Sequence, residues 1–276
     1  MGTITAADVS KLRKMTGAGM MDCKKALQEA GGDFDKAVEI IRKKGQAVAN
    51  KRADREASEG VVLAATTGDK KFGAMIVLNC ETDFVAKNED FVKFAQSILD
   101  KALETKPADL EALKNTELDG KTIAEGVVEK IGIIGEKLDL AYYGKMEAGY
   151  LQPYIHPGNK LASLVGFNKE NVDLQVAKDI AMQVAAMNPV AVDEGDVPAD
   201  IIEKEKEIGR EQARREGKPD NLLDRIAEGK LKKFFKESTL LNQDFIKDSK
   251  KNIRTYLKEA DPELKVTGFL RYSLTV

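Results

Sequence analysis

Few residues in this chain of 276 could do chemistry. His156 is the only histidine and Cys23 and Cys80 are the only cysteines, so neither a multi-histidine metal site nor a Cys–His or Ser–His pair with a spare histidine can be built. Carboxylates are abundant, but their spacing does not mark any two of them as a catalytic pair. The phosphate-binding patterns GxxxxGK[ST] and GxGxxG and the hydrolase pattern GxSxG are absent. We therefore expect no catalytic residues, no metal site and no cofactor, and any action on a nucleotide to go through another protein.

One stretch nevertheless places an aromatic side chain beside a carboxylate. Asp83 and Phe84 follow an apolar run and precede a helical pattern, so we expect them on a loop between two rigid elements, where function concentrates. Such a pair can act as an apolar wedge with a charge at its base. The alternative from residue types alone is that Phe84 packs back into its own core while Asp83 caps the next turn.

The elements that must position this loop are a strand and a helix. The run 72–78 is short, apolar and rich in β-forming residues, which predicts a buried strand, and residues 61–66 predict the strand before it. After the loop, apolar residues recur at helical spacing and Asn88 is a good N-cap. The pattern predicts a helix that ends before Pro107.

The first fifty residues predict a compact unit of three short helices. Thr5 opens the first helix as part of a capping box, and Gly17 ends it. The second helix ends at Gly31. Asp33 can cap the third helix, which we expect Gly45 to close, so that residues 46–59 form a linker or an exposed helix.

Met20 and Met21 stand at the start of the second of these helices, followed by Lys24. Methionine is flexible and polarisable, which suits a surface that must fit a partner. The alternative is that the two methionines fill the small core of the three-helix unit. Lys24 could reach a carboxylate on a partner.

The chain also carries an internal repeat. At an offset of 89 residues Gly60 falls on Gly149 and Asn79 on Asn168, and the apolar run 71–78 falls on residues 160–167. Each copy leads into a helical pattern. Because short turns join the strands within each copy, we predict two related α+β halves with antiparallel sheets, with His156 on a turn between strands.

The composition changes after Pro189. Charged residues dominate 201–216 and leave only a thin apolar stripe, and a second amphipathic pattern follows the break at 217–219. A helix that is polar nearly all round is stable mainly against a similar helix, which predicts a protruding antiparallel hairpin. The alternative is two ordinary amphipathic helices that lie on the core.

Charge and composition exclude several protein classes. The net charge is -2 with 33% charged residues, so positive and negative charges nearly cancel. The sequence shows no locally basic face, and we therefore expect no direct binding of nucleic acid. There is no CxxC pair, no leader sequence in the first five residues and no run of about 18 apolar residues. We therefore expect reduced thiols in a cytoplasmic protein that does not cross a membrane.

Two long motifs in a fixed order resemble one protein family. Residues 16–27 (TGAGMMDCKKAL) and 82–87 (TDFVAK), with Asn79-Cys80 and residues 266–269 (VTGF), closely resemble bacterial elongation factor Ts, and the resemblance runs across the whole chain. That family exchanges guanine nucleotide on elongation factor Tu, the GTPase that carries aminoacyl-tRNA to the ribosome. The resemblance therefore implies an exchange factor in translation elongation that does no bond chemistry and whose partner is elongation factor Tu.

The resemblance implies a fold that agrees with these patterns. It comprises a ubiquitin-associated-like three-helix domain over 1–54, a first core subdomain over 55–144, and a second over 145–189 and 236–276, with an inserted coiled-coil hairpin at 190–235. Members differ in whether they pair through the core, which leaves a homodimer and a one-to-one complex as alternatives. Many members carry a further C-terminal module, and we expect its contacts to be absent here or supplied elsewhere.

The resemblance also assigns roles to residues. Phe84 resembles the aromatic residue that enters between two helices of the GTPase's nucleotide domain, and Asp83 resembles the neighbour that disturbs the helix helping to hold Mg²⁺. This favours the wedge over the core alternative. The contact loop expected from the resemblance is Thr82, Asp83, Phe84 and Val85, and the other expected partner contacts are Met20, Met21, Lys24, Ile131, Gly132 and His156.

Two other functions are open from the residues alone. In a non-catalytic adaptor, the first fifty-odd residues would bind their target alone, whereas an exchange factor needs the loop at 83–84. A small-molecule enzyme has no support in the residues available for chemistry.

Overall fold

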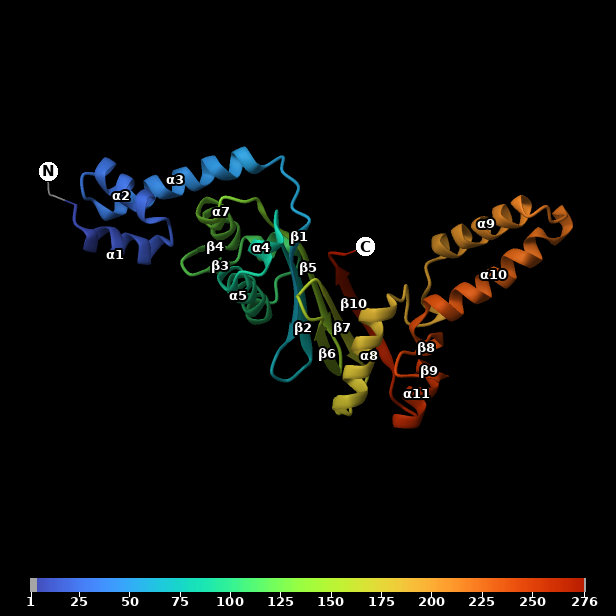
Figure 1. Cartoon of the computed structure of the whole chain (residues 1–276). Coiled ribbons are helices and arrows are strands. Elements are labelled where there is room, and N and C mark those ends of the chain that lie inside the picture. The colour runs from blue at the N-terminus through green and yellow to red at the C-terminus, as the bar shows by residue number, and fades with distance from the viewer. Residues whose placement is uncertain (1–3, 276) are drawn as a thin grey trace.

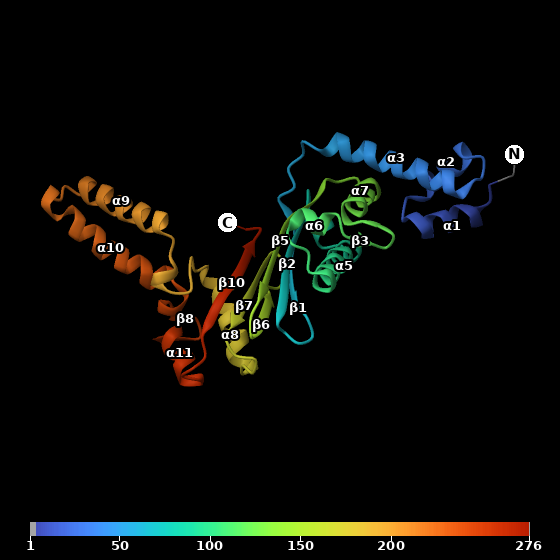
Figure 2. The same ribbon diagram turned by 180° about the vertical axis from the view of Figure 1, so that it is seen from behind.

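The computed structural model describes residues 4–275 and shows three parts that follow one another along the chain (Figure 1). A three-helix domain lies at one end, a core of sheets and helices lies in the middle, and a helical hairpin projects from the other end (Figure 2). The predicted α+β fold is confirmed. Residues 1–3, which belong to the stretch considered above for a leader sequence, and residue 276 lie outside the described part. Between residues 4 and 275 no helix is long and apolar enough to cross a bilayer.

The N-terminal domain contains the three predicted helices: α1 (Ala6–Thr16), α2 (Met20–Glu29) and α3 (Phe34–Arg52). The capping box is present, because Thr5 and Asp8 each bond the other's backbone N–H. Gly17 ends α1 in the left-handed conformation, with φ 69°. The small core between the helices is formed by Leu12, Ala18, Cys23, Ala26, Leu27 and Ala37.

The sequence predicted that the third helix ends at Gly45. This is wrong, because α3 continues to Arg52. Gly45 is buried against Gly132 of α7 (Ile123–Ile134), and a Cβ built on Gly132 would lie 2.5 Å from the Cα of Gly45. The two glycines therefore let two helix backbones touch, which is a use of glycine other than the helix stop that we expected. The helix carries the N-terminal domain directly onto the core.

The core consists of two three-stranded antiparallel sheets packed face to face. The first has the order β1-β2-β5 and the second β10-β7-β6. Their strands are β1 (Glu59–Thr66), β2 (Phe72–Cys80), β5 (Leu138–Glu147), β6 (Tyr150–Ile155), β7 (Leu161–Phe167) and β10 (Val266–Ser273). A cluster that includes Val62, Met75 and Leu164 fills the space between the sheets.

Helices cover the outer face of each sheet (Figures 1 and 2). The first sheet packs on α5 (Glu89–Thr105) and α7, and the second packs on α8 (Leu174–Met187) and α11 (Ile253–Ala260). The shorter elements are α4 (Asp83–Ala86), α6 (Leu110–Lys114), β3 (Glu117–Leu118), β4 (Lys121–Thr122), β8 (Asp244–Phe245) and β9 (Asp248–Asn252). All nine residues of β2 are buried. A strand covered on both faces explains the continuous apolar run at 72–78.

Two close approaches of glycine to asparagine account for the internal repeat. Gly60 lies opposite Asn79 in the β1–β2 pair, and a Cβ at Gly60 would lie 2.8 Å from the Cα of Asn79. A Cβ at Gly149 would lie 2.8 Å from the carbonyl oxygen of Asn168. In each half, only a residue without a side chain fits at the open end of the hairpin, away from its turn.

The hairpin is formed by α9 (Ala199–Arg215) and α10 (Leu223–Ser238), which pack on each other and project from the core (Figure 1). A Cβ at Gly209 would lie 3.1 Å from the Cα of Ala227, and Ala213, Leu223 and Leu231 are buried along the same seam. This confirms the protruding hairpin, and the alternative of two helices that lie on the core is wrong.

Replacing Gly132 with alanine should loosen the docking of α3 on α7. The added Cβ would meet backbone, which cannot move aside unless α3 shifts. We expect the free energy of unfolding to fall by about 1–3 kcal/mol in urea titrations. Limited proteolysis should also cleave residues 53–58 faster, because this segment follows α3.

Gly229→Ala is the matched control, because Gly229 also lies inside a helix but an added Cβ would have nothing within 4 Å. Alanine's higher helix propensity should stabilise this variant by up to about 1 kcal/mol. Equal effects of the two substitutions would contradict the close contact of α3 with α7.

Candidate partner-binding surface around α4

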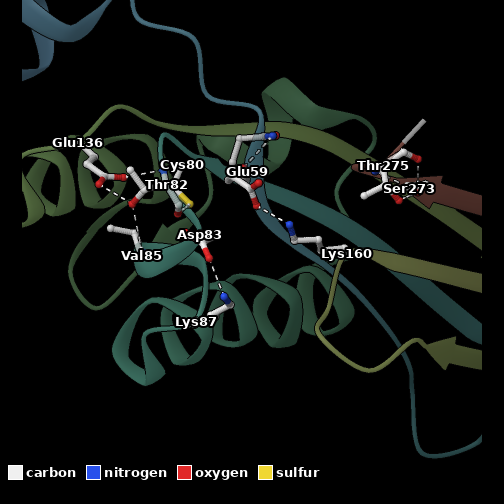
Figure 3. Close-up of polar contacts among 11 residues, drawn as sticks. Glu59, Cys80, Thr82, Asp83, Val85, Lys87, Glu136, Lys160, Ser273 and Thr275 are labelled. Atoms are coloured by element: carbon white, nitrogen blue, oxygen red, sulfur yellow. Dashed lines mark hydrogen bonds and ion pairs between the residues drawn. The ribbon is translucent and has the colours of Figure 1, made fainter.

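Residues 83–86 form one helical turn, α4, where the sequence predicted a loop. Thr82 is its N-cap and accepts a hydrogen bond from the backbone N–H of Val85 over 3.4 Å (Figure 3). Asp83 is therefore inside the turn and is not a cap. The loop prediction was wrong because four residues are too few to show a helical period.

Phe84 points away from the core. Its side chain is 83% exposed, the highest exposure among the large apolar residues of the described chain. Its neighbours anchor the turn, since Ala86 is buried and Val85 packs against the core cluster. The alternative that Phe84 packs into its own core is wrong, and the turn presents one aromatic ring to solvent.

Glu136, which is distant in the sequence, holds the start of α4. Its carboxylate accepts a hydrogen bond from the Thr82 backbone N–H over 3.1 Å and another from the Thr82 hydroxyl over 2.7 Å (Figure 3). Glu136 follows the C-terminal end of α7, 54 positions after Thr82 in the sequence. The contact therefore ties α4 to the end of α7.

Glu81 ties the same point to the N-terminal domain. Its carboxylate accepts hydrogen bonds from Arg52 at the end of α3, over 2.9 and 3.1 Å, and from the backbone N–H of Lys137 over 2.6 Å. The hydrogen bond from Lys137 and the Arg52 guanidinium lower the pKa of the Glu81 carboxyl below its usual value. The Lys137 ammonium in turn donates to the carbonyl oxygens of Ala53 and Arg55.

Asp83 is half-exposed and accepts a hydrogen bond from Lys87 over 2.6 Å (Figure 3). This bond lowers the pKa of the Asp83 carboxyl, and the positive charge of Lys160 lowers it further. Asp83 is therefore an anion at neutral pH. It lies beside the exposed Phe84 ring in the sequence and in α4.

Cys80 offers no reactive thiol at this surface. It is fully buried, and burial, with the charges of Glu136 and Glu59, raises the pKa of the thiol to about 12. The reactive thiolate form is thus suppressed.

The second half of the core contributes the turn that carries His156. The imidazole is exposed, and its Nδ1 lies 3.0 Å from the hydroxyl of Tyr154. Lys160 on the same turn forms an ion pair with Glu59 at the start of β1, with 2.8 Å between the charged atoms (Figure 3). Because Lys160 also acts on Asp83, this turn and α4 lie at the same end of the sandwich.

The structure does not bring every predicted contact residue to this place. Met20 and Met21 are 59% and 62% exposed at the start of α2, with Lys24 also exposed, in the N-terminal domain (Figure 1). The alternative that both methionines fill the small core is wrong. Ile131 is buried in the core, and Gly132 is half-buried with its backbone against Gly45 of α3.

Sequence reasoning missed the residues that support α4. Arg52 ends α3, and Glu136 and Lys137 follow α7, so all three are distant from α4 in the sequence. No local pattern marks them. Only the capping preference of Thr82 could have indicated that a helical turn begins at Asp83. Among residues 4–275, no three His, Cys, Asp or Glu side chains lie together so that they could hold a metal ion.

Replacing Glu81 with glutamine should reduce the pH dependence of folding. Because the carboxyl pKa is lower in the folded chain, the ionised group stabilises the protein above its unfolded pKa of about 4.3, and this is lost as pH falls through the folded value. We expect the variant to lose about 1.5–3 kcal/mol of unfolding free energy near neutral pH and less in acid. Urea titrations from neutral pH down to below a pH of about 4.3 measure the loss at neutral pH and its decrease in acid.

Glu89→Gln is the control, since Glu89 is exposed and pairs only with Lys93, over 3.4 Å. It should change the unfolding free energy by less than about 0.5 kcal/mol. A deficit of Glu81→Gln that stays constant from neutral to acid pH would contradict the role given to the ionised carboxylate.

The chain is similar to proteins of one family. The profile described as "Elongation factor TS" matches residues 81–275. The Elongation factor Ts of Porphyromonas gingivalis is 55% identical over 273 residues, which cover 98% of each chain. That of Azobacteroides pseudotrichonymphae is 52% identical over 273 residues, 99% of each chain, and that of Flavobacterium psychrophilum is 50% identical over 275 residues, 99% of this chain and 100% of the relative.

The profile covers most of the chain, and the similarity to these relatives extends through the three-helix domain, the core and the hairpin. The same span includes α4 with its exposed aromatic residue. The chain therefore belongs to the elongation factor Ts family.

Proposed function

We propose that this protein is a guanine-nucleotide exchange factor that binds the GTPase elongation factor Tu and promotes the release of GDP during translation elongation. Membership of the elongation factor Ts family supports the place in translation elongation. The observation that carries the exchange mechanism is Phe84, a large apolar side chain held out in water by a turn that is otherwise anchored.

The exposed ring can supply free energy when it is buried in the partner. Complete burial of such a side chain contributes about 1.5–3 kcal/mol. Because Thr82 caps the turn and Val85 and Ala86 fix it to the core, α4 is already ordered before it binds. Binding then loses little conformational entropy in this segment.

Asp83 places a negative charge at the base of the ring. Its bond with Lys87 is an exposed pair at i,i+4 spacing, which contributes little, so a partner group can displace it. We place Phe84 between two helices of the GTPase's nucleotide domain, with Asp83 disturbing the helix that helps to hold Mg²⁺. With Mg²⁺ held less firmly, the charge of the diphosphate is less neutralised and GDP leaves faster.

Two further contacts fit the same partner. Met20, Met21 and Lys24 form an adaptable apolar patch with a cation on the N-terminal domain, and His156 is exposed at the end of the core that carries α4. Because α3 connects the patch rigidly to the core, binding at one place raises the effective concentration at the other. Ile131 and Gly132 are given a supporting role, since Ile131 packs α7 into the core and Gly132 lies against Gly45 of α3.

This mechanism needs no bond chemistry. If binding of the exchange factor weakens the affinity for nucleotide, then binding of nucleotide weakens the affinity for the factor by the same ratio. Incoming GTP therefore displaces the factor and completes the cycle.

Phe84→Ala should abolish most of the exchange activity without unfolding the protein. The test is the release of a fluorescent GDP analogue from elongation factor Tu at increasing concentrations of the factor. Loss of the ring's burial should lower the maximal release rate by about 10–100-fold. Since Phe84 is 83% exposed, the unfolding free energy should change by less than about 0.5 kcal/mol.

Leu174→Ala is the matched control, because Leu174 is an apolar residue that is 49% exposed at the start of α8. It should leave release unchanged. If the wild-type protein binds the GTPase but does not accelerate release, the exchange function is wrong. If Phe84→Ala keeps the wild-type rate, the role given to the ring is wrong.

The double substitution Met20→Ala and Met21→Ala should weaken binding rather than the exchange step, because the patch lies on a different domain from α4. We expect the half-saturating concentration of the factor to rise by about tenfold at an unchanged maximal rate. Met187→Ala, an exposed methionine at the end of α8, is the control. A lower maximal rate at an unchanged half-saturating concentration would contradict the assignment of binding to the methionine patch and of exchange to α4.

A further inference from the structure

The direction of Phe84 depends on bonds from outside α4. A helix of four residues contains too few hydrogen bonds to be stable alone. The ring itself adds no anchor, since it is almost fully exposed. Val85 and Ala86 fix the later part of the turn to the core, so the direction of the ring also depends on how the N-cap residue before the turn is held.

Thr82 is that N-cap residue, and its side chain and its backbone N–H are all hydrogen-bonded. Its hydroxyl oxygen accepts from the Val85 N–H, while its hydroxyl and its backbone N–H both donate to Glu136. The two bonds go to different carboxylate oxygens, Oε1 and Oε2. Because two points of contact restrict rotation as well as distance, Glu136 fixes the orientation of Thr82 and not only its place.

Glu136 is itself held on a fixed turn. Gly135 before it adopts the left-handed conformation, with φ 82°, and closes α7 by donating its N–H to Ile131 over 2.8 Å. Lys137 after it donates its backbone N–H to Glu81. The residues on both sides of Glu136 are thus hydrogen-bonded, so its carboxylate extends from a held turn just after α7. Figure 3 shows this carboxylate beside Thr82.

We infer that Glu136 is a positioning residue for nucleotide exchange, which holds the start of α4 so that Phe84 leaves the surface in the productive direction. This inference rests on the proposed function of the Phe84 turn. Glu136 does not need to touch the partner, because it acts through Thr82. The consequence is that loss of Glu136 should affect the exchange step more than the strength of binding.

The experiment measures release of the fluorescent GDP analogue with the full-length protein and three variants. Glu136→Ala removes both acceptors, and we expect the maximal release rate to fall about tenfold with less than about a twofold change in half-saturation. Glu136→Gln can still accept from the Thr82 N–H and donate to its hydroxyl oxygen, so it should keep most of the rate. Asp139→Asn neutralises a nearby exposed carboxylate on β5 and should behave as wild type.

Amide hydrogen exchange of the free protein provides a second, independent readout. Glu136→Ala should speed exchange at the backbone N–H groups of Thr82 and Val85, while the amides of β2 stay protected. Glu136→Gln should exchange at these two positions nearly as slowly as wild type. This arm does not depend on the GTPase, so it decides whether Glu136 holds α4 even if the proposed function fails in the wild-type assay.

The inference is overturned if Glu136→Ala keeps the wild-type maximal rate, or if only its half-saturation changes. It is also overturned if Glu136→Gln is as slow as Glu136→Ala, because the hydrogen bonds would then not be the cause. Unchanged amide exchange at Thr82 and Val85 in a folded Glu136→Ala variant would show that the turn holds its position without Glu136.

Discussion

A single constraint governs this structure: a helical turn too short to hold itself must present a large apolar residue to water. The carboxylates at 81 and 136 meet that constraint together. Glu136, just after α7, accepts from Thr82. Glu81 accepts from Arg52 at the end of α3 and from Lys137 just before β5. All of these hydrogen bonds have a charged carboxylate as acceptor, which makes them stronger than hydrogen bonds between neutral groups. The sheets, the helices on them and the arm that carries the N-terminal domain all contribute to the position of this turn.

The sequence predicted the fold well where physical signals were local. Apolar runs, capping residues such as Thr5 and Asn88, and the repeat marked by Gly60 and Gly149 led to the correct helices, strands and halves. Gly45 misled the prediction, because a glycine signals equally a helix end and a contact between helix backbones. Only the partner helix, with Gly132 at the crossing, distinguishes the two uses, and the sequence gives no sign of that crossing.

The site was predictable in part. Asp83 and Phe84 were found from their place between a strand and a helix, and the resemblance decided between the exposed and buried positions of the ring. Their support was not predictable, since Glu136 and Lys137 reach residues 81–82 only after the first sheet and α7 have formed. Ile131 and Gly132 illustrate the reverse case, where residues expected at a partner are used in the packing of the chain itself.

The continuity of α3 has a consequence for how this family can change over time. The helix has 19 residues and joins the three-helix domain to the core without a break. Each residue added or removed between Ala37 and Gly45 would turn that domain by about 100° and move it about 1.5 Å along the axis. Insertions and deletions should therefore be purged from this part of the helix during evolution, while single-residue replacements on its exposed face accumulate freely.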